Sequence, residues 1–187
     1  MSAVRGKLVV GVVGLPGSGK STFAGVAGRL GFGVVVMGDV VRLEARRRGL
    51  EPTSENLGRL MLELRRLEGD AVVAKRCIPL IEDSGDRVVV DGVRSLAEVD
   101  EFRRRYPRFK LVAVYASPET RFRRLFRRGR SDAPADWAAF QERDMREIGV
   151  GVAAAMALAD YMLVNEGGIE QFKEEAEKLL RELVRDE

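Results

Sequence analysis

The chain has no histidine and only one cysteine, Cys77. The lack of histidine excludes a Ser-His-Asp triad, imidazole acid–base chemistry and histidine-ligated zinc. A single cysteine can form neither an internal disulfide nor a cysteine metal cluster. Any catalysis must therefore rest on carboxylates, lysine, arginine, a metal ion and positioned backbone groups.

The sequence also lacks an apolar run long enough to cross a membrane. Met1–Gly6 leads directly into an apolar segment and has no signal-peptide pattern. We therefore expect a cytoplasmic protein without a membrane partner.

The net charge of the chain is small, and aromatic residues are few. The formal net charge is +3, and aromatic residues make up 6% of the chain. A nucleic-acid-binding module usually combines a basic surface with aromatic side chains for stacking, so we do not expect nucleic acid as a partner. Clusters of arginine leave such a module as an alternative. The 187 residues, 45% of them hydrophobic, suit one domain with its own core.

The most informative segment is Gly14–Ser21, which matches the phosphate-binding pattern G-x-x-x-x-G-K-[ST]. Its glycines let the backbone approach a phosphate, and successive N–H groups form an anion-binding nest. The pattern predicts that Lys20 reaches the β- and γ-phosphates and that Ser21 ligates Mg²⁺. The predicted ATP-binding residues of this loop are Gly14, Leu15, Pro16, Gly17, Ser18, Gly19, Lys20, Ser21 and Thr22.

Five short apolar runs alternate with helical patterns, which indicates an α/β domain with a parallel sheet between helices. The expected strands are Lys7–Val13, Gly33–Met37, Arg87–Asp91, Lys110–Ala116 and Tyr161–Asn165. We therefore expect the three-layer fold of phosphate-loop nucleoside triphosphatases, with a five-stranded parallel sheet in the order 2-3-1-4-5. We expect one domain over residues 1–187, with a helical acceptor-binding lobe at about 40–83 and a short lid region at about 121–146.

Within the lobe, one helix should be capped by Thr53 or Ser54 and run toward Leu67, and a second should run from about Asp70 to Glu82. Ser95–Glu98 has the pattern of a capping box for the helix after the third strand.

Charged and polar residues follow the strands, at the sheet edge where such folds bind ligands. Arg42 and Arg94 follow two different strands and could grip a second, anionic substrate. Asp91 lies where it could hold a metal-bound water. Arg124 and Arg128 are four residues apart on one helix face, where a guanidinium could stack on a purine or bind phosphate.

These residues resemble the nucleoside monophosphate kinase group, which includes adenylate kinase and dephospho-CoA kinase, and most closely an archaeal adenylate-kinase-related family. The resemblance rests on Gly14–Ser21, Gly38–Arg42, Asp91–Arg94, the arginine pair and Ala159–Gly167. It implies transfer of a phosphoryl group from ATP, with Mg²⁺, to a small anionic acceptor. The implied catalytic residues are Lys20, Asp39, Arg94 and Arg128, the acceptor-binding residues Asp39, Arg42 and Arg94, the metal residues Ser21 and Asp91, and the further ATP-binding residues Arg124 and Asn165.

Several points stay open at this level. Asp39 could be a base for a hydroxyl acceptor or a second-shell metal residue, and the acceptor could be a nucleoside monophosphate or dephospho-CoA. Arg143, Asp144 and Arg146 could act on the transition state or form surface pairs. Arg65 and Arg76 are candidates for acceptor contacts, with solvation the expected state. An ATPase switch without an acceptor is the main alternative, and we expect a monomer or small homo-oligomer.

Overall fold

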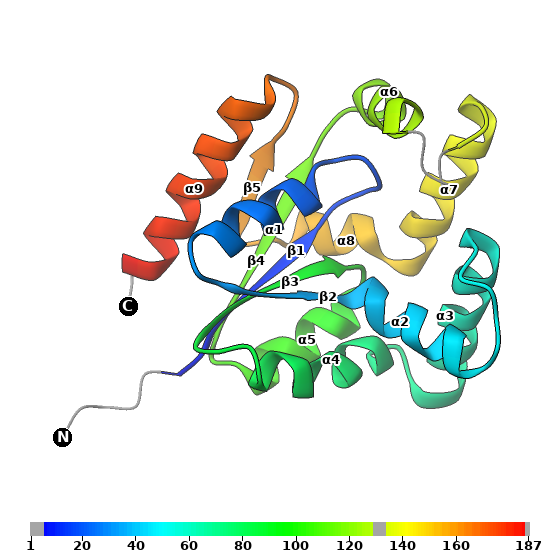
Figure 1. The fold of residues 1–187 in the computed structure, drawn as a ribbon, viewed down its shortest axis with the longest axis horizontal. Coiled ribbons are helices and arrows are strands. Elements are labelled where there is room, and N and C mark those ends of the chain that lie inside the picture. The colour runs from blue at the N-terminus through cyan, green and yellow to red at the C-terminus, as the bar shows by residue number, and fades with distance from the viewer. Residues whose placement is uncertain (1–5, 129–133, 186–187) are drawn as a thin grey trace.

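The structure is a computed structural model that describes residues 6–128 and 134–185. Its centre is a five-stranded, all-parallel sheet in the order β2-β3-β1-β4-β5 (Figure 1). The fold class and strand order expected from the sequence are therefore confirmed. The strands are β1 Leu8–Val13, β2 Gly33–Val36, β3 Arg87–Val93, β4 Arg108–Tyr115 and β5 Tyr161–Val164.

Helices cover both faces of the sheet because its central strands are apolar on both sides. On one face, α1 (Lys20–Arg29) packs beside α9 (Ile169–Arg185). Phe23 of α1 and Leu180 of α9 are buried in the core on this face. The other face is covered by α5 (Leu96–Arg105) and α8 (Val152–Ala157), with further helices of the lobe. Two apolar cores result, one on each face.

The lobe between β2 and β3 contains α2 (Met37–Arg47), α3 (Ser54–Glu68) and α4 (Val72–Glu82). We expected only the last two helices. The additional helix α2 forms because Met37, Val41 and Ala45 recur at helical spacing and face the core. Gly38–Arg42, the segment after the second strand, thus lies in the first turns of a helix.

Side-chain caps fix where several helices begin. Thr53 accepts a hydrogen bond from the Asn56 amide at 3.2 Å at the start of α3, as predicted. At the start of α5, Ser95 accepts from the Glu98 amide at 3.3 Å. The Glu98 carboxylate does not complete the expected capping box, because it accepts from the Arg94 amide at 2.7 Å instead.

Two further helices border the phosphate loop, α6 (Pro118–Arg128) and α7 (Trp137–Val150). The predicted lid region includes residues 129–133, which lie outside the described residues. Nowhere in 6–128 or 134–185 is a helix both long and apolar enough to cross a membrane.

Candidate active site

The predicted phosphate loop lies between the carboxyl end of β1 and the start of α1 (Figure 1). Two of its glycines cannot carry a side chain in this setting. A Cβ at Gly14 would strike the Val114 carbonyl oxygen, and a Cβ at Gly19, whose φ is 116°, would strike the Asn165 side-chain amide. The backbone can therefore pack tightly against β4 and against the segment after β5.

Lys20, the first residue of α1, folds back over the loop. Its Nζ donates to the carbonyl oxygens of Gly14 at 2.7 Å and Leu15 at 3.2 Å. Burial lowers the pKa of Lys20 to about 8, against the opposing effect of the Asp91 carboxylate. The ammonium group is thus partly desolvated, and the phosphates of a nucleotide would favour its charged form.

Asp91, the last residue of the expected third strand, lies inside β3, which continues to Val93. The register between β1 and β3 shifts here, because Val12 pairs with Asp91 while Val13 pairs with Val93, and the extra residue Gly92 has a φ of 103°. Burial raises the pKa of Asp91, while Lys20 and a hydrogen bond with the Ser21 side chain act in the opposite direction. The two predicted metal residues, Ser21 and Asp91, therefore lie close together.

This pair suits Mg²⁺ better than a metal that needs a full set of protein ligands. In the described part of the chain, no group of three or more Cys, Asp or Glu side chains could hold a metal ion. Magnesium prefers oxygen ligands and keeps several waters, so one hydroxyl and one carboxylate next to a nucleotide are sufficient.

Arg124 and Asn165, the two further residues expected to bind ATP, contact each other beside the loop. Arg124 Nη2 donates to Asn165 Oδ1 at 3.2 Å, and Asn165 Nδ2 donates to the Ser18 carbonyl oxygen at 2.8 Å. Among the described residues, Arg124 Nη1 and Ser18 Oγ are buried without a hydrogen-bond partner. Two polar atoms at the loop are thus available to a ligand. Arg128 lies exposed at the end of α6.

The three predicted acceptor residues form two separate ion pairs. Arg42 Nε donates to Asp39 Oδ1 at 2.9 Å within α2, and the Asp39 side chain is 65% exposed. Arg94 Nη1 lies 3.2 Å from Glu147 Oε1 on α7. We did not predict Glu147 from the sequence, because nothing local marks one glutamate on a charged helix.

Arg121 is the second residue that the sequence did not single out. Its side chain is 2% exposed and forms a bidentate ion pair with Asp144 on α7. Nη1 also donates to the Pro16 carbonyl oxygen at 3.4 Å, and Nε donates to the Ala116 carbonyl oxygen at 3.0 Å. Asp144 therefore belongs to a buried pair that joins α6, α7 and the phosphate loop.

The remaining candidates separate in the structure. Arg146 is exposed, while Arg143 is half-buried and influences Lys20 electrostatically. We had expected Arg65 to be solvated, and this was wrong. Its Nη2 donates to Glu98 Oε1 at 2.7 Å in a buried ion pair. Arg76 pairs with carboxylates of the lobe.

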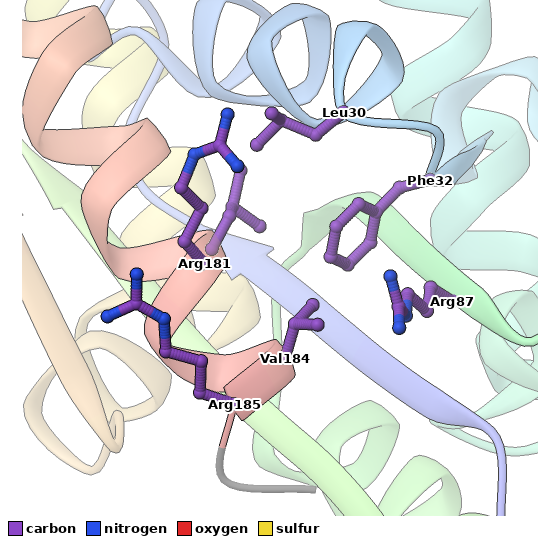
Figure 2. A pocket seen from close by; sticks show the side chains of 7 residues that line it. Leu30, Phe32, Arg87, Arg181, Val184 and Arg185 are labelled. Atoms are coloured by element: carbon purple, nitrogen blue, oxygen red, sulfur yellow. The ribbon is translucent and has the colours of Figure 1, made fainter.

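A pocket of about 180 Å³ opens at the other end of the sheet, near the start of β3 and the last turns of α9 (Figure 2). No predicted site residue lines it. Because the phosphate loop follows the carboxyl end of β1, this pocket lies apart from the candidate active site. Its lining is apolar and cationic: Leu30, Phe32, Arg87, Leu180, Arg181, Val184 and Arg185.

Comparison with known sequences places the chain in a family. A UPF0200 protein of Hyperthermus butylicus is 51% identical over 179 residues, which cover 95% of this chain and 96% of that protein. A UPF0200 protein of Methanocaldococcus jannaschii is 42% identical over 180 residues, covering 95% and 91%. The chain belongs to the UPF0200 family. A family model described as an AAA domain also matches residues 13–141 of the present chain.

Solved structures share the fold at low sequence identity. TT1252 from Thermus thermophilus superposes with a TM-score of 0.63 and 20% identity, covering 96% of this chain and 99% of that one. A shikimate kinase from Acinetobacter baumannii, in complex with shikimate, superposes with a TM-score of 0.60 and 17% identity, covering 98% of this chain and 96% of that one. A gluconokinase from Sinorhizobium meliloti superposes with a TM-score of 0.60 and 17% identity, covering 97% of this chain and 96% of that one. These likenesses confirm the phosphate-loop kinase fold, while the finer resemblance to adenylate kinase and dephospho-CoA kinase stays a prediction.

Proposed function

We propose that this UPF0200 protein transfers the γ-phosphoryl group of ATP to a small acceptor. The observation that carries the proposal is the position of Arg94. This cation follows β3, the strand that contains Asp91, and Arg94 acts electrostatically on both Lys20 and Asp91. The nearness of this cation to the phosphate loop supports a second, anionic substrate, which a kinase needs and simple hydrolysis of ATP does not.

On the donor side, backbone N–H groups of the loop and Lys20 would bind the phosphates. Ser21 and Asp91 would hold Mg²⁺, which neutralises charge on the phosphates when it is bound. The buried Arg124 Nη1 and the Asn165 amide, which belong to hydrogen-bonded neighbours beside the loop, are the proposed contacts to the nucleoside. Arg128 would come closer only if α6 closes over the nucleotide.

On the acceptor side, Arg42 and Arg94 would hold the second substrate. Asp39 would accept a proton from a hydroxyl acceptor, or assist the metal if the acceptor is a phosphate. Asp39→Asn separates these roles, because loss of a base slows transfer by about 10²–10⁴-fold. A slowing of less than about tenfold would indicate an acceptor that needs no base.

The structural neighbours include a shikimate kinase and a gluconokinase, which supports a small-molecule kinase. The AAA-domain match keeps ATP hydrolysis without an acceptor as the second candidate. Both functions need the phosphate loop, so the presence of a phosphorylated acceptor decides between them.

The test is a screen with ATP, Mg²⁺ and candidate acceptors: nucleoside monophosphates, dephospho-CoA, shikimate and gluconate. Transfer should occur to at least one acceptor and should disappear in Lys20→Ala. Lys178→Ala, an exposed lysine of α9, is the matched control and should behave as the unchanged protein. Loss of ATP without a phosphorylated acceptor would contradict the kinase proposal, as would normal transfer in Lys20→Ala.

A further inference from the structure

Glu147 neutralises the main cation of the proposed acceptor site. Its Oε1 lies 3.2 Å from Arg94 Nη1, and its side chain is only 15% exposed. The same Nη1 lies 3.5 Å from the sulfur of Met61 on α3. Arg94 is therefore held between a carboxylate from α7 and a thioether from the lobe, and an incoming acceptor meets an arginine that already has a partner.

The charges around this point nearly cancel. Within the described residues, four cations and three carboxylates act on one another: Lys20, Arg42, Arg94 and Arg143, with Asp39, Asp91 and Glu147. The magnesium complex of ATP adds a net negative charge, and a phosphate monoester carries close to two more at neutral pH. A phosphate acceptor would therefore bring its dianion to a site whose own cations exceed its carboxylates by only one, before the charge of the nucleotide is added.

We infer that Glu147 makes the protein selective for an acceptor that reacts through a hydroxyl group and not through a phosphate group. This inference rests on the proposed kinase function. A hydroxyl can donate a hydrogen bond to the Glu147 carboxylate while the ion pair with Arg94 persists. A phosphate dianion would compete with Glu147 for Arg94 and would be repelled by the displaced carboxylate, which lowers its affinity.

The transfer itself is balanced without a further reactant. The acceptor oxygen forms a bond to the γ-phosphorus, and the bond from that phosphorus to the bridging oxygen of the β-phosphate breaks, so ADP leaves. The hydroxyl proton passes to a carboxylate of the site and then to water. The product is a phosphomonoester, whereas a nucleoside monophosphate that reacts through its phosphate gives a phosphoanhydride.

Phosphorus NMR of the products tests the inference directly, because the two bond types have different chemical shifts. The full-length protein is incubated with ATP, Mg²⁺ and each acceptor of the two classes. The expected new signal is a phosphomonoester. A phosphoanhydride as the main product of the preferred acceptor would overturn the inference and leave the kinase proposal intact.

Glu147→Gln provides a second test, in which two readouts should move in opposite directions. With the loop filled by Mg²⁺ and a non-hydrolysable ATP analogue, the Kd for AMP should fall about tenfold, because Arg94 loses its anionic competitor. The kcat/KM for the hydroxyl acceptor should fall by a similar factor. A variant that only loosens the structure would raise the Kd for AMP and lower the kcat/KM for the hydroxyl acceptor.

Glu142→Gln is the matched control, since Glu142 is exposed on the same helix. It should change neither readout. An unchanged or raised Kd for AMP in Glu147→Gln would overturn the inference, even if the hydroxyl acceptor were phosphorylated. If no acceptor of either class is phosphorylated, the kinase proposal fails, and the AMP measurement still decides whether Glu147 opposes a phosphate at Arg94.

Discussion

Arg121 and Asp144 form a bidentate ion pair, with Nη1–Oδ1 at 2.8 Å and Nη2–Oδ2 at 2.7 Å. The guanidinium also lies 5.0 Å from the centre of the Phe140 ring and donates to the carbonyl oxygen of Pro16 in the phosphate loop. This one side chain therefore connects the loop to α7, the helix that carries Glu147. The position of α7 and the position of the loop depend on the same buried pair.

Asp144→Ala should strongly destabilise the protein, because it leaves the Arg121 charge buried without its partner. Such losses generally cost about 3–5 kcal/mol of the free energy of unfolding, and urea denaturation of the variant would measure the loss. Affinity for ATP should also fall, since Arg121 contacts Pro16. Arg146→Ala changes an exposed residue of the same helix and should alter stability by about 0.5 kcal/mol or less. Equal stability of the two variants would contradict this account of the pair.

Asn165→Ala should weaken ATP binding while the fold persists. The substitution removes the amide that donates to the Ser18 carbonyl oxygen and the oxygen that accepts from Arg124. Loss of two such hydrogen bonds predicts an affinity lower by about tenfold, measured by calorimetry. Gln171→Ala, on the exposed side of α9, is the control and should bind ATP normally. Unchanged binding by Asn165→Ala would refute the role of this residue.

ATP binding should be coupled to uptake of a proton by Lys20. In the free protein burial lowers the pKa of Lys20 to about 8, so a growing fraction is neutral as the pH rises above 8. Bound phosphates favour the ammonium and raise this pKa, so uptake should be about half a proton at pH 8 and larger at pH 9. Affinity for ATP should therefore fall as the pH rises from 8 to 9.

Calorimetry in buffers of different ionisation enthalpy measures this uptake. Lys20→Met should abolish the proton uptake in addition to weakening binding. If the unchanged protein binds ATP at pH 8–9 without taking up protons, the account of a desolvated Lys20 is wrong.

Cys77 should be inert to thiol reagents in the folded protein. It is buried in the core, and burial raises its pKa to about 12, with a smaller contribution from Glu98. Between pH 9 and 12 the unfolded thiol releases a proton that the folded one keeps, so this residue lowers stability as the pH rises through that range. Mass spectrometry after alkylation at pH 8 should detect modification only when denaturant is added, and rapid native labelling would contradict the placement.

The sequence predicted the parts of the site that depend on local chemistry. Gly14–Ser21 could be identified because its glycines and Lys20 act within eight consecutive residues, and the apolar strands fixed the sheet that carries it. The position of Asp91 was predicted only approximately, because the bulge at Gly92 continues β3 beyond it.

Contacts between distant residues could not be predicted in the same way. Arg121 and Asp144 are 23 residues apart, and Arg65 and Glu98 are 33 apart. In the sequence these are charged residues among many others on helices, and only tertiary packing shows which of them are buried. The same reason explains why Glu147 was missed, since its importance lies in its contact with Arg94.

The most direct test of the central claim is the stoichiometry of the reaction. With the best acceptor from the screen, ADP and phosphorylated acceptor are measured in the same sample over time. The account predicts one phosphorylated acceptor for each ADP, and little ADP when the acceptor is omitted. ADP formed at the same rate with and without every acceptor, with no phosphorylated product, would contradict it.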